Sequence, residues 1–219
     1  MYSDSIKQWN VFVGCQYSCT YCKKSFQAQM KRQKHNCIKC YNYEPHTHPL
    51  RLTQSLPYTK GDEFIWVGSS GDISFCNDYF FEAILERVKS MPKRTFFFQT
   101  KNPKWFEKWE FPKNTILGIT LETNRNIPQI SKAPSPFERA NEFYLIQHPR
   151  KFITIEPILE FDFQDFLGFI HSIYPERVYI GFDTKKNNLV EPSISKVKNF
   201  IKKLKRFTIV KEKYMKGEK

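Results

Sequence analysis

Short apolar runs alternate with amphipathic segments along most of this 219-residue chain, and no other feature limits its fold as strongly. The apolar runs lie at residues 8–14, 64–67, 95–99, 115–121, 151–155 and 177–180. Segments with apolar residues at helical spacing lie at residues 23–35, 78–91, 103–109, 135–147, 163–173 and 193–206. Near-continuous apolar runs are typical of parallel strands covered on both faces, and parallel strands need crossover connections that are usually helices. The sequence therefore predicts an α/β fold with a mostly parallel sheet.

The length of the chain points to an incomplete barrel. Six main strands are predicted, and residues 207–210 are a candidate for one more edge strand. A complete eightfold barrel takes about 250 residues, so 219 residues are too few for a barrel that also carries an insertion. We expect a partial (β/α)6 TIM-like barrel formed by residues 1–219 as one domain, in which residues 193–219 are a basic C-terminal helix and tail.

The composition favours a soluble protein of a reducing compartment. No run of about 18 apolar residues occurs, and residues 1–10 lack the basic and then apolar order of a signal peptide. The six cysteines form two tight groups plus Cys76, whereas a disulfide framework would spread them along the chain. We therefore expect a cytoplasmic protein with metal-bound cysteines and no membrane partner.

The net charge of +13 is concentrated in two segments. Residues 196–219 contain ten lysines and arginines against two acids, and residues 23–39 contain six against none. Two basic segments on an otherwise balanced chain are expected of a protein that binds a polyanion such as nucleic acid. A solvated helix face and a basic tail would give the same pattern, so the charge alone leaves both interpretations open.

Three cysteines directly after the first apolar run, Cys15, Cys19 and Cys22, are separated by three and then two residues. A [4Fe-4S] cluster normally takes four thiolates. This stretch supplies three, so one iron would stay open to a small molecule, as a catalytic zinc keeps one position for water or substrate. The alternatives are a structural zinc site and thiols that bind no metal.

The spacing of these cysteines, with Tyr21 directly before the third, resembles the motif of the radical S-adenosylmethionine (radical SAM) superfamily. Residues 99–103 and 155–157 further resemble uncharacterised, phage-associated radical-SAM-like proteins. The resemblance implies a partial barrel, a [4Fe-4S] cluster on the three cysteines, and S-adenosylmethionine (SAM) bound at the open iron. It also implies that an electron from a flavodoxin- or ferredoxin-type donor cleaves SAM to a 5′-deoxyadenosyl radical, which takes a hydrogen atom from a substrate.

Polar residues follow the predicted strands at their carboxyl ends, which is where ligands bind in βα barrels. They are Cys15, Asp72, Gln99, Thr100, Lys101, Glu122, Asn124, Glu156 and Asp183. One such residue would be weak evidence, because Asp and Asn often cap helices. Their recurrence at six strand ends predicts a binding site at this end of the barrel.

The resemblance assigns roles to some of these positions. The stretch Gly68-Ser69-Ser70-Gly71-Asp72 occupies the place of the family's glycine-rich motif, although it reads Ser-Ser-Gly-Asp where many members have Gly-Gly-Glu. Its backbone and Asp72 are expected to contact the SAM amino group. From their position alone, Glu122 and Asn124 are expected at the SAM ribose and carboxylate. Tyr21 is expected to lie against the adenine.

Residues 35–62 lack clear periodicity and contain Cys37, Cys40, His46 and His48. The two-residue gap between the cysteines allows both thiolates to bind one tetrahedral ion, which His46 or His48 would complete. A structureless loop of this length is unusual inside a compact domain, and a metal staple would explain it. Zinc is the preferred ion. A second iron-sulfur cluster, a substrate-handling pair and two unligated cysteines are the alternatives.

The leading hypothesis is a radical SAM enzyme whose basic segments favour nucleic acid, or a protein-bound nucleotide, as the substrate of modification or repair. Cys76, just past the second strand, is a candidate for returning a hydrogen atom, as in radical enzymes that repair thymine lesions; an ordinary small apolar residue is the alternative. Two other functions stay open. One is a non-catalytic nucleic-acid-binding protein with zinc at both cysteine groups. The other is an activase that makes a glycyl radical on a partner protein.

Overall fold

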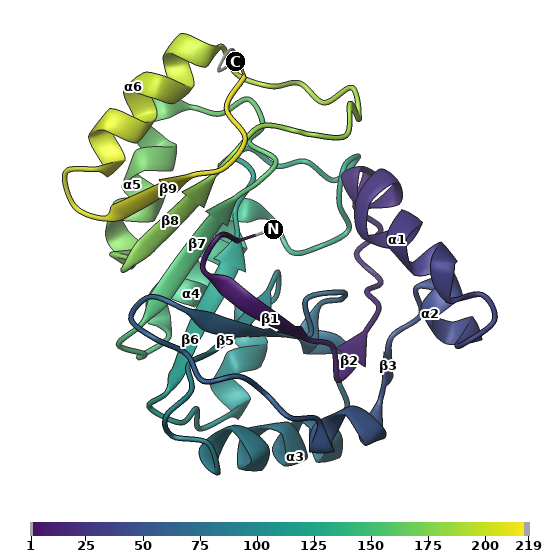
Figure 1. Cartoon of the computed structure of the whole chain (residues 1–219). Coiled ribbons are helices and arrows are strands. Elements are labelled where there is room, and N and C mark those ends of the chain that lie inside the picture. The colour runs from purple at the N-terminus through teal and green to yellow at the C-terminus, as the bar shows by residue number, and fades with distance from the viewer. Residues whose placement is uncertain (1, 217–219) are drawn as a thin grey trace.

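A computed structural model describes residues 2–216 of the chain. Seven strands form one parallel sheet in the order β1-β4-β5-β6-β7-β8-β9. Their bounds are β1 Ser5–Trp9, β4 Phe64–Val67, β5 Phe96–Thr100, β6 Thr115–Thr120, β7 Lys151–Ile155, β8 Arg177–Ile180 and β9 Ile209–Glu212. The sheet curls into a half-barrel (Figure 1). The predicted α/β partial barrel is confirmed, and β9, the candidate edge strand, brings the sheet to seven strands.

Helices on the outer side of the curved sheet connect successive strands (Figure 1). They are α3 Asp78–Lys89, the 3-10 helix Pro103–Lys108, α4 Pro136–Leu145, α5 Phe163–Ile173 and α6 Ile194–Leu204. Side-chain caps fix the starts of α3, α4 and α6. Asn77 Oδ1 accepts a hydrogen bond from Phe80 N at 2.9 Å ahead of α3, and Ser135 and Glu138 form a capping box on α4. These caps satisfy backbone donors that would otherwise lack partners at the helix starts.

The strands separate two apolar layers, because successive side chains of a strand point to opposite faces of the sheet. Phe96 and Phe98 belong to the outer layer, which packs under the helices, while Phe97 belongs to the inner layer. The inner layer consists of Tyr2, Phe64, Trp66, Phe97, Ile116, Phe152 and Tyr179. Gly118 makes room for it, since a Cβ there would lie 2.4 Å from the Phe97 ring. The inside of the half-barrel is therefore a packed core rather than a pore.

The first predicted strand is wrong over half of its length. The predicted strand covered residues 8–14, but β1 ends at Trp9. The rest of that stretch contains a separate short strand, β2 (Phe12–Val13), which pairs antiparallel with β3 (His46–Thr47). His48 N reinforces this pair by donating to Val11 O at 2.7 Å. A two-residue strand carries too little periodicity to be recognised, and its apolar residues merge with those of β1 in the sequence.

Two further segments differ from their predictions: residues 35–62 contain more secondary structure than expected, and residues 23–35 form a less regular helix than expected. Residues 35–62, called the insertion below, contain α2 (Ile38–Asn42), β3 and the 3-10 helix Pro49–Thr53. The predicted helix at residues 23–35 consists of a π-helical turn Lys23–Gln27, a short α1 (Ala28–Met30) and a 3-10 turn Lys31–Gln33.

The C-terminal helix follows its predicted pattern. α6 buries Val197, Phe200, Ile201 and Leu204, whereas Ile194 at its start is 39% exposed. The last three residues of the predicted tail, 217–219, lie outside the described part of the chain. Within residues 2–216, no helix has both the length and the apolar character needed to cross a membrane.

Candidate functional site

A cavity of about 380 Å³ opens at the carboxyl ends of the strands. Most of the polar residues predicted at the strand ends line it. Residues 15–22 are called the cysteine loop below, and its other two cysteines, Cys19 and Cys22, line the cavity as well. Those strand-end residues are Cys15, Asp72, Gln99, Thr100, Lys101, Glu156 and Asp183. Residues 68–72 are called the glycine-rich turn below. Residues 69–72 of this turn and Tyr21 also line the cavity. The structure thus brings the two motifs of the sequence to one site.

Two glycines bring the cysteine loop against the glycine-rich turn. Gly14 N donates to Ser70 O at 3.1 Å, and Asp72 N donates to Gly14 O at 3.1 Å. Gly14 has a φ of +100°, and a Cβ there would lie 2.2 Å from Glu44 O. A Cβ on Gly71 would lie 2.4 Å from Gly14 O. Only glycine allows this approach at both positions, so the pair of glycines sets Cys15 next to the turn.

The three thiols of the cysteine loop line the same cavity without forming a compact single-ion site. Within residues 2–216, only one group of three or more His, Cys, Asp or Glu side chains has all its donor atoms within 4.8 Å of one another, and that group lies in the insertion. A single zinc ion needs donors that close, because Zn–S and Zn–N bonds are about 2.0–2.3 Å long. Cys15, Cys19 and Cys22 line the cavity without being such a group.

Lys101 places an ammonium group next to Cys19. Its Nζ donates to Cys19 Sγ at 3.1 Å, and Ser131 Oγ lies 3.1 Å from the same sulfur. A hydrogen bond from Cys22 and the charge of Lys101 lower the pKa of Cys19 to about 5, although burial opposes the shift. The same hydrogen bond, together with burial, raises the pKa of Cys22. Lys101 thus favours the thiolate form of Cys19, which is the form that binds metals.

Glu122 is fully buried behind this wall of the cavity and bridges two cations. Lys101 Nζ and the Tyr21 hydroxyl both donate to Oε1, and Arg139 Nη1 donates to Oε2 at 2.9 Å. Burial alone would raise the pKa of Glu122, but the charges of Arg139 and Lys101 hold that pKa well below its usual value. Glu122 therefore fixes the positions of Lys101 and Tyr21, and through Lys101 it acts on Cys19.

Asp72 uses its carboxylate to join the ends of β4 and β5. Oδ1 accepts hydrogen bonds from Thr100 Oγ1 at 2.6 Å and from Ser74 N at 3.1 Å, and Oδ2 accepts one from Lys101 N at 2.8 Å. Burial raises the pKa of Asp72 in spite of these hydrogen bonds. The carboxylate therefore has a structural role in the turn as well as a place on the cavity wall.

Of the residues predicted to bind SAM or to act in catalysis, four do not line the cavity, namely Gly68, Glu122, Asn124 and Cys76. Gly68 shapes the turn with a φ of +65°. Asn124 Oδ1 accepts from Asp162 N at 2.9 Å, where α5 begins. Cys76 lies in the outer apolar layer, and burial raises its pKa to about 12. Cys76, the candidate for returning a hydrogen atom, therefore packs under the helices and away from the cavity, as an ordinary small apolar residue would.

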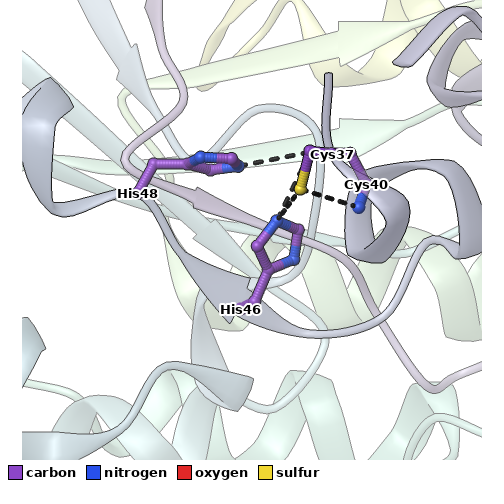
Figure 2. Close-up of side chains that lie close together, drawn as sticks. All are labelled: Cys37, Cys40, His46 and His48. Carbon is purple, nitrogen blue, oxygen red and sulfur yellow. Dashed lines mark hydrogen bonds between the residues drawn. The ribbon is translucent and has the colours of Figure 1, made fainter. Parts of the chain in front are cut away.

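The four side chains predicted to bind a second metal come together at one end of the insertion (Figure 2). Cys37 caps α2, Cys40 lies within that helix, His46 belongs to β3, and His48 follows it. The structure thus brings both histidines to the cysteine pair, where the sequence left open whether His46 or His48 would complete the site.

Sequence reasoning missed three residues of the site. Arg139 lies on the buried face of α4 together with Ala140 and Phe143, and an arginine within an apolar stripe was the available signal. Tyr43, which has a φ of +60° at the end of α2, lines the cavity without any sequence pattern that would indicate it. Ser131, which contacts Cys19, lies in a loop and gave no signal either.

Comparison with protein-family models gives no match for this sequence. Comparison with curated proteins gives none either. Among solved structures, the fold is similar to that of Streptococcus suis SuiB, whose crystal structure was determined bound to S-adenosylmethionine. The TM-score is 0.56 over 97% of this chain, at 7% sequence identity, and the chain spans 51% of SuiB. At so low an identity the likeness concerns the fold alone.

Proposed function

We propose that this protein is a radical SAM enzyme in which Cys15, Cys19 and Cys22 hold a [4Fe-4S] cluster. The observation that carries the proposal is the meeting of three thiols and a glycine-rich turn in one cavity at the carboxyl end of a parallel half-barrel. The cavity volume of about 380 Å³ falls in the range of small-molecule sites, about 300–1,000 Å³. The fold likeness to SuiB, which was solved with SAM bound, supports SAM as the ligand.

The residues around the thiols suit this group. Three cysteines leave one iron of a four-iron cluster without a protein thiolate, and Asp72 beside the cavity suits an ammonium group such as that of SAM. When bound, the cluster would pass one electron to SAM and so generate the 5′-deoxyadenosyl radical that takes a hydrogen atom from the substrate. That electron comes from a low-potential donor of the flavodoxin or ferredoxin class.

The chain's own side chains prepare and shield the site. Lys101 favours the thiolate form of Cys19 and neutralises part of the negative charge that three thiolates bring to a buried wall. Tyr17, Tyr21 and Tyr43 line the cavity beside the thiols. Glu122 keeps Lys101 and Tyr21 in place, so we assign it a positioning role in place of the predicted contact with the ligand, because it is fully buried and does not line the cavity.

We further propose that the substrate is anionic, with nucleic acid as the first class to test. Lys185 and Lys213 line the cavity, and Lys24 Nζ donates to Lys186 O at 2.7 Å, which draws the first basic segment to the same side. Lys213 is the one residue of the second basic segment that lines the cavity, whereas the lysines of α6 lie elsewhere, since α6 packs on the outer side of the sheet (Figure 1). The lysines near the cavity, rather than α6, are therefore the proposed contacts to the substrate.

Anaerobic reconstitution tests the cluster assignment. The wild-type chain treated with iron and sulfide should gain the brown absorption of an iron-sulfur cluster, and SAM should change the electron paramagnetic resonance spectrum of the reduced cluster. Cys19→Ala should lose the cluster, whereas the control Cys76→Ala should keep it. Zinc without sulfide at these cysteines would instead support the non-catalytic nucleic-acid-binding protein.

Salt dependence tests the substrate class. Binding of single-stranded RNA or DNA should weaken steeply as salt rises, because each phosphate contact releases a counterion. Replacing Lys185 and Lys213 by Gln should reduce that dependence, while the exposed α6 residues Lys198 and Lys202 should serve as matched controls with little effect. Binding that does not respond to salt would favour a small-molecule substrate or the glycyl-radical activase.

A further inference from the structure

We infer that Cys37, Cys40, His46 and His48 bind one structural zinc ion, and that this ion holds the insertion against the cysteine loop. The inference concerns a separate site and does not depend on the proposed reaction. All four donor atoms lie within 4.8 Å of one another. Figure 2 shows the two imidazole rings and the cysteines facing a common point.

The donor spacing matches a tetrahedral ion. Cys37 Sγ lies 3.3 Å from His46 Nε2, and Cys40 Sγ lies 3.3 Å from His46 Nε2 and 3.2 Å from His48 Nε2. Zn–S bonds of about 2.3 Å and Zn–N bonds of about 2.0–2.1 Å at tetrahedral angles put sulfur and nitrogen roughly 3.5 Å apart. The donors are therefore preassembled at close to the spacing that zinc requires.

The surrounding backbone orients two of the donors. His46 Nδ1 lies 2.7 Å from Glu44 O, so a proton on Nδ1 leaves the Nε2 lone pair free to bind a metal. Cys40 N donates to Cys37 Sγ at 3.4 Å, which stabilises a thiolate at that sulfur. Hydrogen bonds of this kind from metal-binding residues to backbone groups are the usual support of a zinc site.

The insertion has too little apolar core to hold itself together. Between residues 35 and 62, only Cys40 and Leu56 are buried, while Ile38 is 61% and Leu50 is 91% exposed. Small units of this kind usually rely on a metal or on disulfides for stability. The six cysteines of the chain are free thiols, so no disulfide adds to the β2–β3 pairing that ties the insertion to the cysteine loop, and a metal on the four donors would supply that support.

The donor set identifies the ion and its role. Two thiolates and two imidazoles in a tetrahedron are typical of zinc. Four protein ligands fill the coordination sphere and leave no position for water or substrate, which distinguishes a structural site from a catalytic one. The site is therefore a staple that joins α2 to β3.

This staple reaches the cysteine loop through short connections. His46 pairs with Val13 in the β2–β3 ladder, two residues before Cys15. Cys15 N donates to Tyr43 O at 3.4 Å, and Tyr43 lies between Cys40 and His46 in the chain and lines the cavity. An ion at the four donors thus fixes both ends of the segment that carries Tyr43. Its removal should loosen the wall of the cavity on this side.

Elemental analysis of the full-length protein tests the site. Wild type purified anaerobically should contain one zinc ion per chain, and Cys40→Ser and His46→Ala should lose it. His35→Ala, an exposed histidine just before the group, is the matched control and should keep it. A variant with Cys15, Cys19 and Cys22 all changed to Ala should also keep its zinc, so failure of the cluster proposal and failure of this one can be told apart. Zinc retained in Cys40→Ser, or iron in its place, would overturn the inference.

Two measurements on the wild-type chain remain informative if the variants do not fold. Cobalt(II) exchanged for zinc should give the intense visible absorption of a tetrahedral thiolate site, and a weak octahedral spectrum would contradict the assignment. Hydrogen exchange should then compare the metal-free and zinc-bound chains. Removal of zinc should speed amide exchange in residues 11–17 and 43–48 and leave β6 to β8 unchanged. Unchanged exchange in residues 11–17 would show that the staple does not support the cysteine loop.

Discussion

Glu122 connects the stability of the protein to the arrangement of its site. The carboxylate is 0% exposed, yet it carries a charge that Lys101 and Arg139 compensate. A buried ion pair adds little net stability compared with an apolar pair, but removal of one partner leaves an uncompensated buried charge. The residues of this group should therefore be sensitive to single substitutions.

Arg139→Met should lower the free energy of unfolding by about 3 kcal/mol, because it leaves Glu122 with one cation and frees the Pro134 and Thr120 carbonyls that Arg139 now binds. Urea denaturation at neutral pH measures the change. The matched control is Arg125→Met, which breaks the exposed pair with Asp162 and should change stability far less. An equal decrease in the free energy of unfolding in both variants would show that the buried Arg139–Glu122 pair contributes no more to stability than the exposed Arg125–Asp162 pair.

The pH dependence of stability should report Glu122 as well. Its pKa in the folded protein is depressed, so its contribution is fully present above the unfolded-state pKa of about 4.3 and is lost as the pH falls toward the folded value. The stability gap between wild type and Glu122→Gln should therefore narrow on acidification from neutral pH to about pH 3. A gap that stays constant or widens over this range would contradict the assigned charge state.

At the scale of elements, the β2–β3 pair and the two glycines determine where the cysteine loop lies. The backbone of Gly14 approaches Glu44 O so closely that no side chain fits, and its φ of +100° disfavours other residues as well. Gly14→Ala should therefore separate the insertion from the cysteine loop and cost more than about 1 kcal/mol of stability. It should also increase proteolytic cleavage within residues 35–62.

Gly168→Ala is the control for that substitution. Gly168 lies in α5 with open space around the position of a Cβ, so alanine should raise the free energy of unfolding by about 0.5–1 kcal/mol through its helix propensity. Thermal or urea unfolding separates the two outcomes. A neutral Gly14→Ala variant would mean that the loop and the insertion are not held as close as the structure has them.

The sequence predicted the elements better than their connections. The predicted bounds of β4 to β8 agree with the structure to within one residue at each end, because strands of a buried parallel sheet appear in the sequence as continuous apolar runs. The β2–β3 pair was missed because its strands are two residues long and are separated by residues 14–45. At the site, Lys101 follows β5 and could be placed from the pattern. Its bond to Glu122 joins residues 21 apart in the sequence, and no local pattern records it.

At the scale of the whole molecule, the half-barrel has its cavity at the edge formed by the carboxyl ends of its strands. The inner layer of aromatic side chains fills the interior, so ligands are confined to the carboxyl ends of the strands, where the cavity lies. The chain aligns over 97% of its length with about half of SuiB. The cysteine loop, the glycine-rich turn and the strand ends all fall within this half-barrel.

Reductive cleavage of SAM tests the central claim most directly. The reconstituted wild-type protein, supplied with SAM and dithionite under anaerobic conditions, should form 5′-deoxyadenosine, and Cys19→Ala should form none. Cys40→Ser, if it folds, should form less because it loosens the cavity wall without removing a cluster ligand. Formation of 5′-deoxyadenosine at the same rate by wild type and Cys19→Ala, or by neither in the presence of an assembled cluster, would contradict the account.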